Sequence, residues 1–148
     1  MGTRVDSLLE ERKRVLLVND CIRLIDEEVD SKGGLSGFAI KTAYKAVKAV
    51  KSDFVETAVS HLLPSFLQKL TPFLCSWEES ANREPLERFF SARKSAIADA
   101  LLAVTDERAK KAYRGVVRSA YEKLRPAGKR NVEEAVPRMG RILEKHFD

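Results

Sequence analysis

The spacing of apolar residues is the feature that most constrains how this chain can fold. Along nearly the whole sequence, apolar residues recur at intervals of three and four, and strict alternation of apolar and polar residues is absent over any useful length. Intervals of three and four place side chains on one face of an α-helix, whereas alternation would indicate a strand. We therefore expect an all-α protein, a single-domain bundle of about six helices.

The length and composition fit one compact domain. The chain has 148 residues, of which 44% are hydrophobic and 33% are charged, and a domain of this kind can bury a core without a metal or disulfides. No apolar run approaches the roughly 18 to 20 residues of a membrane span. Residues 1–14 include three acidic side chains and lack an apolar signal core. We expect a single helical domain over 1–148, no membrane insertion and a cytoplasmic location.

Capping residues and prolines set the expected helix boundaries. Ser36 and Thr105 are expected to cap the second and fifth helices. Pro64 is expected to kink or split the third helix, and Pro137 to break the last one near Ala135. The predicted helices are 7–31, 36–50, 52–70, 85–104, 106–124 and 129–146, with a connector over 75–84.

The two halves of the sequence resemble each other. The residues at 43–44 and 55–59 reappear with identical spacing at 120–121 and 132–136. Matching the halves further upstream requires a two-residue gap at the glycines of the first half, for which the second half has no counterpart. The pattern predicts a duplicated three-helix unit, with repeat halves 8–74 and 85–147. Similar composition among helices also produces such matches by chance.

Residues 26–37 are the one place where charge, paired glycines and a hydroxyl gather between two predicted helices. Loop amides that enter a helix can bind an anion. The candidates for an anion or ligand site are Lys32, Gly33, Gly34 and Ser36. The same residues suit helix punctuation, with Gly33 or Gly34 ending the first helix. The spacing GxxxxGK[ST] of a nucleotide loop and the alternating ligands of an EF-hand are both missing.

Basic charge is concentrated in one segment. Between residues 108 and 130, nine Lys and Arg residues stand against one acidic residue, Glu122, whereas the whole chain has a net charge of +5. Two sets spaced at three and four residues are expected to share helix faces: Lys41, Lys45 and Lys48, and Lys110, Arg114 and Arg118. Such a face can bind an acidic protein or a nucleic acid, or it can keep the surface solvated.

The sequence contains no recognisable catalytic or metal-binding pattern. His61 and His146 belong to no Glu-x-x-His or His-x-x-x-His pair, and Cys21 and Cys75 lie in no CxxC motif. No Ser/His/Asp or Cys/His constellation can be proposed from spacing. We therefore name no catalytic residue, metal ligand or cofactor, and the sequence favours a protein that is not an enzyme.

Four motifs are similar to those of a known family. They are Asp26-Glu27-Glu28-Val29-x-x-Lys32-x-Gly34-Leu35-Ser36-Gly37, Ala43-Tyr44-Lys45-x-Val47, Asp99-Ala100-Leu101-Leu102-Ala103-Val104-Thr105-Asp106 and Tyr121-x-Lys123-Leu124-Arg125-Pro126. From about Arg14 to Lys145 the chain resembles a family of small, helical bacterial proteins of unknown function. The resemblance implies a bacterial, cytoplasmic, single-domain protein and transfers neither an activity nor a site residue.

These observations predict a non-enzymatic helical binding or scaffold module. Its basic face would bind an anionic partner, either an acidic protein or a nucleic acid. A homodimer is a compatible oligomeric state. The alternative is a small anion- or ligand-binding protein that uses the glycine loop at 32–37. A third interpretation is a structural partner for another helical protein, which a large exposed apolar patch would indicate.

Overall fold

The structure is a computed structural model that describes residues 7–80 and 84–147. These residues form α-helices and one 3-10 turn, with no strand among them, which confirms the all-α prediction. The elements are α2 (Glu11–Ser31), α3 (Gly34–Val50), α4 (Phe54–Glu79), α5 (Leu86–Ala92), α6 (Lys94–Ala112), α7 (Gly115–Leu124), η1 (Arg125–Ala127) and α8 (Gly128–His146).

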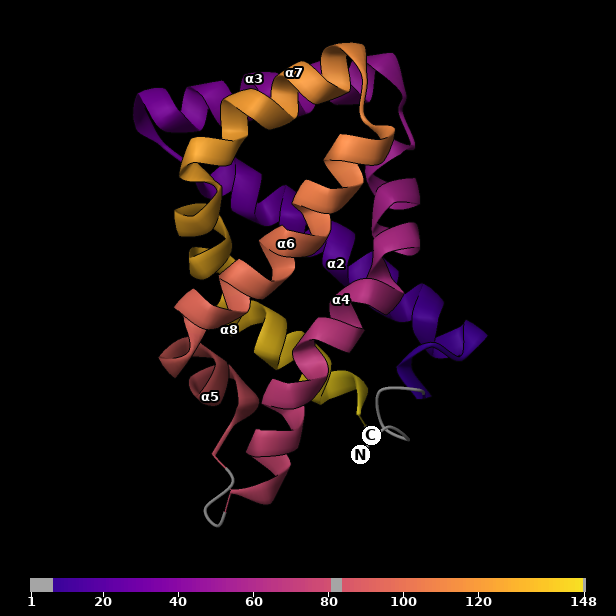
Figure 1. Cartoon of the computed structure of the whole chain (residues 1–148), viewed down its shortest axis with the longest axis vertical. Coiled ribbons are helices and arrows are strands. Elements are labelled where there is room, and N and C mark those ends of the chain that lie inside the picture. Colours follow the sequence, from indigo (N-terminus) through magenta and orange to yellow (C-terminus); the bar gives the residue numbers. More distant parts are fainter. Residues whose placement is uncertain (1–6, 81–83, 148) are drawn as a thin grey trace.

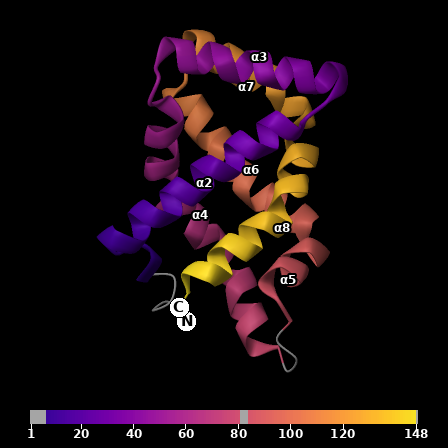
Figure 2. The same ribbon diagram turned by 180° about the vertical axis from the view of Figure 1, so that it is seen from behind.

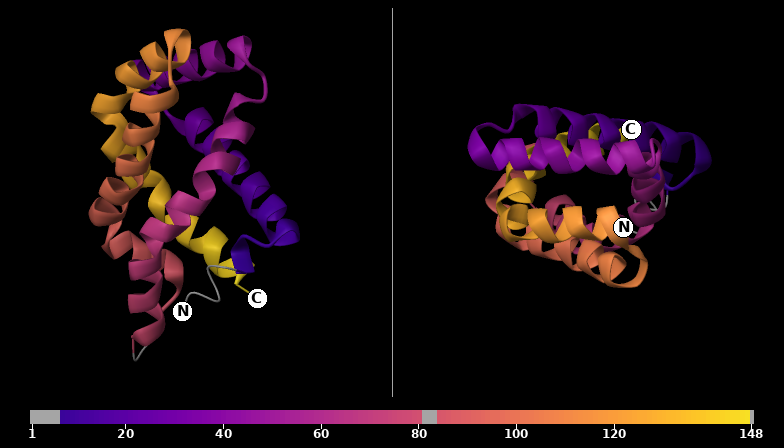
Figure 3. Two further views of the ribbon diagram at one scale, coloured as in Figure 1. Left: turned by 45° about the vertical axis from the view of Figure 1, so that its right-hand side comes forward. Right: turned by 90° about the horizontal axis from the view of Figure 1, so that it is seen from above.

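The helices form a body, and one further pair of helices lies across one end of it. Helices α2, α4, α6 and α8 make up the body, and α5 packs against α8 at the end opposite the pair (Figure 1). Helices α3 and α7 lie side by side across the other end, as the view from behind and the view from above both show (Figures 2 and 3). Two segments far apart in the sequence therefore share one surface.

Two hydrophobic clusters hold this arrangement together. The larger lies within the body and includes the fully buried side chains of Leu67, Phe90 and Val136. The smaller joins α3 to α7 through Ala43, Val47 and Ala120, with partly buried neighbours around them. Burial of apolar side chains is the main stabilising contribution to both. The small side chains of the second cluster bring α3 and α7 close together but bury little area.

Pro64 does not split its helix. α4 runs without interruption from Phe54 to Glu79, past the expected end of the third helix and into the segment predicted as a connector. A proline has no N–H, so the carbonyl four residues earlier loses its helical donor. That carbonyl belongs to Ser60, and the Arg14 guanidinium donates a hydrogen bond to it at 2.7 Å. The side chain from α2 replaces the missing backbone donor.

Three other predicted boundaries are wrong. α8 continues through Pro137 without the expected break near Ala135. Thr105 does not cap a helix, because it lies inside α6, where its hydroxyl donates to the Leu102 carbonyl at 3.1 Å. Ser36 lies within the first turn of α3, which already begins at Gly34, and its side chain is outside the described residues.

Helices α3 and α7 begin in the same way. α2 and α6 are each followed by a residue in an extended conformation, Lys32 and Tyr113, and two residues later the next helix starts at a glycine. Gly34 has φ +70° and Gly115 has φ +59°, values that L-residues adopt only with strain. The second half does therefore have a counterpart of the glycine loop, contrary to the match by sequence. The duplicated unit itself stays a prediction.

Candidate functional site

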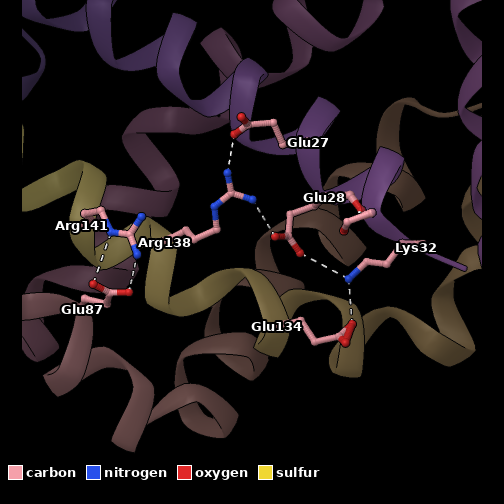
Figure 4. Close-up of polar contacts among 8 residues, drawn as sticks. Glu27, Glu28, Lys32, Glu87, Glu134, Arg138 and Arg141 are labelled. Carbon is pink, nitrogen blue, oxygen red and sulfur yellow. Dashed lines mark hydrogen bonds and ion pairs between the residues drawn. The ribbon is translucent and has the colours of Figure 1, made fainter.

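The Lys32 side chain turns away from the glycine loop. Its ammonium donates to Glu28 on the same helix at 3.2 Å and to Glu134 on α8 at 2.7 Å (Figure 4). Only 14% of the side chain is exposed. Burial alone would lower the pKa of Lys32, but the hydrogen bonds to Glu134 and Glu28 outweigh it and raise that pKa. The lysine charge is thus already balanced by two carboxylates.

The same contacts belong to a network that fastens α8 to its neighbours. Arg138 donates to Glu28 at 3.0 Å and also to Glu27, both on α2. Arg141, further along α8, donates two hydrogen bonds to Glu87 of α5, at 3.2 and 2.6 Å (Figure 4). Paired guanidinium and carboxylate groups of this kind fix the orientation of helices. We interpret this network as structural.

One glycine of the loop, Gly37, lies close to the backbone of Lys32. A Cβ at Gly37 would lie 2.5 Å from the carbonyl carbon of Lys32 and 2.6 Å from its oxygen. The Gly37 N–H donates to the Gly33 carbonyl at 3.0 Å, as the first turn of α3 requires. Gly33 and Gly34 are exposed, with open space where a Cβ would stand. The anion site at 32–37 stays a prediction, and the orientation of Lys32 gives it no support.

Helix α3 presents three lysines and contains no acidic residue. Lys41 is half-buried, and Lys45 and Lys48 are exposed. The Lys48 ammonium lies 3.5 Å from the Asp26 carboxylate and 4.6 Å from the centre of the Tyr44 ring. The three lysines lie on one flank of the helix, because their spacing of four and three residues matches the helical repeat.

The second predicted basic set does not lie on one helix. Lys110 belongs to the last turns of α6, Arg114 is the residue before α7, and Arg118 lies on α7. The chain turns at Tyr113–Gly115, so residues spaced four apart across the turn do not lie on one helix face. Lys110 and Arg118 nevertheless line the same surface depression across the turn. Arg118 also pairs with Glu122 at 3.2 Å.

We define the α3–α7 end as the surface formed by residues 34–51 and 114–124. Its cations are Lys41, Lys45, Lys48, Lys51, Arg114, Arg118 and Lys123, and its one acidic residue is Glu122. Among the residues that the structure describes, Lys45, Lys51, Arg114 and Lys123 have no acidic partner within ion-pair distance. The α3–α7 end therefore carries most of its positive charge uncompensated.

Large apolar side chains accompany this charge. Leu35 is 91% exposed and Phe38 is 71% exposed, and both lie in the first two turns of α3. Their separation of three residues puts them on one face of the helix. Val50 and Val116 add further exposed apolar surface at the α3–α7 end. Exposed apolar side chains gathered beside cations are a feature of interaction surfaces.

A tyrosine on each helix of this end is anchored to an aspartate beneath it. The Tyr44 hydroxyl on α3 donates to Asp26 on α2. Burial and this hydrogen bond hold the pKa of Tyr44 well above its usual range. Lys48, four residues after the tyrosine, pairs with the same aspartate. The contacts tie α3 to α2.

The equivalent anchor on α7 is formed by Tyr121, whose hydroxyl donates to Asp106 on α6. Arg125, again four residues after the tyrosine, donates to both oxygens of Asp106 at 2.8 and 3.0 Å. That hydrogen bonding lowers the pKa of Asp106. Burial and the bond to Asp106 raise the pKa of Tyr121 to about 12. Both phenols are neutral donors at pH 7.

The histidines are not gathered into a site. His61 is exposed on α4, whereas His146 is buried with Nε2 2.6 Å from a carboxylate oxygen of Asp20. Within residues 7–80 and 84–147, no group of three or more His, Cys, Asp or Glu side chains could hold a metal ion. None of the helices in that part of the chain is long and apolar enough to cross a membrane.

An apolar cavity of about 210 Å³ lies between α2, α4, α6 and α8. No sequence pattern predicted it, because the spacing of apolar residues indicates which side chains face inward but not whether they fill the space between helices. The larger volumes found elsewhere are open surface depressions, including the one that Lys110 and Arg118 share.

Comparison with known families matches residues 5–147 to the model of DUF6918, described as a family of unknown function. No curated protein and no solved structure matches the chain.

Proposed function

The chain belongs to this family of unknown function, and we propose that it is a non-enzymatic binding module whose α3–α7 end docks an acidic protein surface. The observation that carries the proposal is the charge of that end, where seven Lys and Arg residues accompany Glu122 as the one acidic residue. Elsewhere in the molecule, cations such as Lys32 and Arg138 are paired with carboxylates. Exposed cations without an ion pair among the described residues, such as Arg12 and Lys69, also lie elsewhere. The α3–α7 end nevertheless has seven cations against one carboxylate, a net charge of +6, whereas the whole chain has +5, so the positive charge of the protein is concentrated at this end.

The exposed apolar residues favour a protein over a nucleic acid as the partner. Leu35 and Phe38 would stay in water if the cations contacted only a phosphate backbone. A protein partner can cover both with an apolar groove while its carboxylates meet the surrounding lysines, which is the usual arrangement of apolar centre and polar rim. The hydroxyls of Tyr44 and Tyr121 are engaged with aspartates, so they are not available to read bases.

The α3–α7 end is also held in place before any partner arrives. Tyr44 anchors α3 to α2, and Tyr121 anchors α7 to α6. A surface whose backbone is fixed in advance loses less conformational entropy on binding. The α3–α7 end therefore suits a docking role better than an anion site that uses Lys32, because Lys32 is already paired with two carboxylates.

The proposal is tested with three labelled probes: a helical peptide with glutamates on one face and leucines on the other, polyglutamate, and a DNA duplex. We expect the amphipathic acidic peptide to bind most tightly, with an affinity that falls as salt rises. Lys45→Glu should weaken it about fivefold, the equivalent of about 1 kcal/mol. Phe38→Ser should weaken the amphipathic peptide but not polyglutamate.

The matched control is Lys69→Glu, a charge reversal at an exposed position on α4 outside the α3–α7 end. This variant should bind the peptide as the unmodified protein does. Tighter binding of the DNA duplex than of either peptide would favour a nucleic acid as the partner and overturn the proposal. So would equal losses in Lys45→Glu and Lys69→Glu, because the binding would then follow net charge alone.

The proposal includes a cytoplasmic location. Cys21 and Cys75 are half-buried free thiols, and free thiols are maintained in reducing compartments. Cell fractionation followed by alkylation of the recovered protein would test this location. Recovery of the protein in an oxidising compartment would contradict it.

A further inference from the structure

We propose that the cavity between α2, α4, α6 and α8 is a binding site for a small, uncharged, apolar molecule such as an aromatic hydrocarbon. The proposal is independent of docking at the α3–α7 end, because the cavity is lined by residues of α2, α4, α6 and α8. It rests on the size of the cavity, the chemistry of its wall and the partial exposure of some of its lining side chains.

The size of the cavity exceeds an ordinary packing defect. Protein interiors are close-packed, and voids larger than a water molecule are few. An engineered apolar cavity of about 150 Å³ stays dry and admits benzene. The volume here is about 210 Å³. The space therefore matches a molecule somewhat larger than one aromatic ring.

The wall of the cavity offers no group to a polar ligand. Leucines such as Leu17, Leu63 and Leu101 form much of it, and its two side chains with a hydroxyl or thiol are Thr105 and Cys21. The Thr105 hydroxyl is already engaged, since it donates to the Leu102 carbonyl at 3.1 Å and its oxygen lies 3.0 Å from the Tyr121 hydroxyl oxygen. A charged or strongly polar molecule would lose its hydration without replacement.

The Cys21 thiol adds no charge to this wall. Burial, assisted by the charge of Asp20, raises the pKa of Cys21 to about 11. The group is thus a neutral thiol at pH 7 and behaves as a small apolar side chain. The ligand class that fits the wall is a hydrocarbon without hydrogen-bonding groups.

Some lining side chains also reach the protein surface. Phe66 of α4 and Met139 and Ile142 of α8 line the cavity and are partly exposed. A ligand can enter if these side chains change rotamer, without separation of the helices. The unbranched Met139 side chain adapts readily to such a change. Pro64 and Pro137 lie within two residues of the lining side chains Leu63 and Met139, and a proline inside a helix disturbs close packing of the neighbouring turn.

The test uses the full chain with benzene, phenol and benzoate as probes, followed by NMR of ¹³C-labelled methyl groups and by the melting temperature. We expect saturable shifts of the Leu63, Leu101 and Met139 methyls with benzene, together with a rise in melting temperature. Benzoate should produce neither effect, and phenol a weaker one. Dissolved xenon should shift the same methyls, since it needs only an apolar space.

Val132→Phe fills the cavity from α8 and should abolish the benzene shifts. Val116→Phe is the matched control, because Val116 is exposed on α7 and does not line the cavity. Benzene shifts confined to Leu35 and the neighbouring surface of α3 would overturn the proposal, as would the absence of saturable shifts with both benzene and xenon. If Val132→Phe does not fold, the xenon result on the unmodified protein decides the question.

Discussion

The hydroxyl of Tyr121 on α7 donates a hydrogen bond to the carboxylate of Asp106 on α6. The bond crosses the turn at Tyr113–Gly115 and holds α7 over the end of the body. Tyr44 makes the same contact with Asp26 across the turn between α2 and α3. Each helix of the α3–α7 end is therefore joined to the preceding helix by a phenol.

Tyr121→Phe removes one partner of a hydrogen bond between a hydroxyl and a charged group. We expect the free energy of unfolding to fall by about 1 to 2 kcal/mol, measured by urea denaturation. Tyr113→Phe is the control, because among the described residues the Tyr113 ring makes edge contacts but its hydroxyl has no hydrogen-bond partner. Equal losses in the two variants would show that the bond contributes nothing specific.

Acid should weaken the fold in part through Asp20. Burial raises the pKa of Asp20, but hydrogen bonds from His146 and Lys145 outweigh it, so that the pKa in the folded protein is lowered. A carboxylate with a lowered pKa contributes stability above its unfolded value of about 4, and this contribution is lost as the pH falls through the folded pKa.

Asp20→Asn should accordingly flatten the dependence of unfolding free energy on pH below about 5. The measurement is a series of urea titrations from neutral pH downwards. Asp53→Asn serves as the control, since Asp53 is exposed and has no cationic partner among the described residues. An identical pH profile for Asp20→Asn and the unmodified protein would contradict the prediction.

Leu101→Ala should cost about 2 to 5 kcal/mol, because a buried leucine is lost next to an existing cavity. Lys110→Ala, on the exposed side of the same helix, should stay within about half a kcal/mol of the unmodified protein. Both changes in the free energy of unfolding are measured by thermal and urea denaturation. A melting temperature that does not change in Leu101→Ala would refute its place in the core.

Gly34→Ala should destabilise the protein by about 1 kcal/mol, because alanine is strained at a φ of +70° even though the space for its Cβ is open. Gly33→Ala provides a neighbouring control with negative φ and equally open space. Gly37→Ala should cost more than either, since its Cβ would meet the Lys32 backbone. Urea denaturation of the three variants gives the order, and a larger loss for Gly33→Ala than for Gly34→Ala would contradict it.

Local periodicity was sufficient to predict the fold class and much of the helix content. The resemblance to a family of unknown function is likewise confirmed by the family match. The breaks at Arg93 and at Tyr113–Gly115 were missed, because apolar residues keep their spacing across both. For the same reason the spacing predicts one helix face for Lys110 and Arg118, whereas the structure places them on two helices, α6 and α7.

The spacing of apolar residues does not predict which side chains meet in the folded protein. Lys32 turns toward Glu134, a residue 102 positions later, and no local pattern specifies such a pairing. The cavity depends on how closely four helices pack, which is a matter of volumes and not of periodicity. Lys41, Lys45 and Lys48, by contrast, were predicted to share one helix face because they lie within a single helix, and α3 places them so.

The modest cluster of Ala43, Val47 and Ala120 beneath α3 and α7 has a consequence for motion. Segments with few buried apolar contacts open at lower free energy than the rest of a protein. Amide protons of α3 should thus exchange with solvent before those of α4, while the large core around Leu67 and Phe90 remains closed. A partner that captured α3 would slow this exchange, so hydrogen exchange could detect docking without knowledge of the partner's identity.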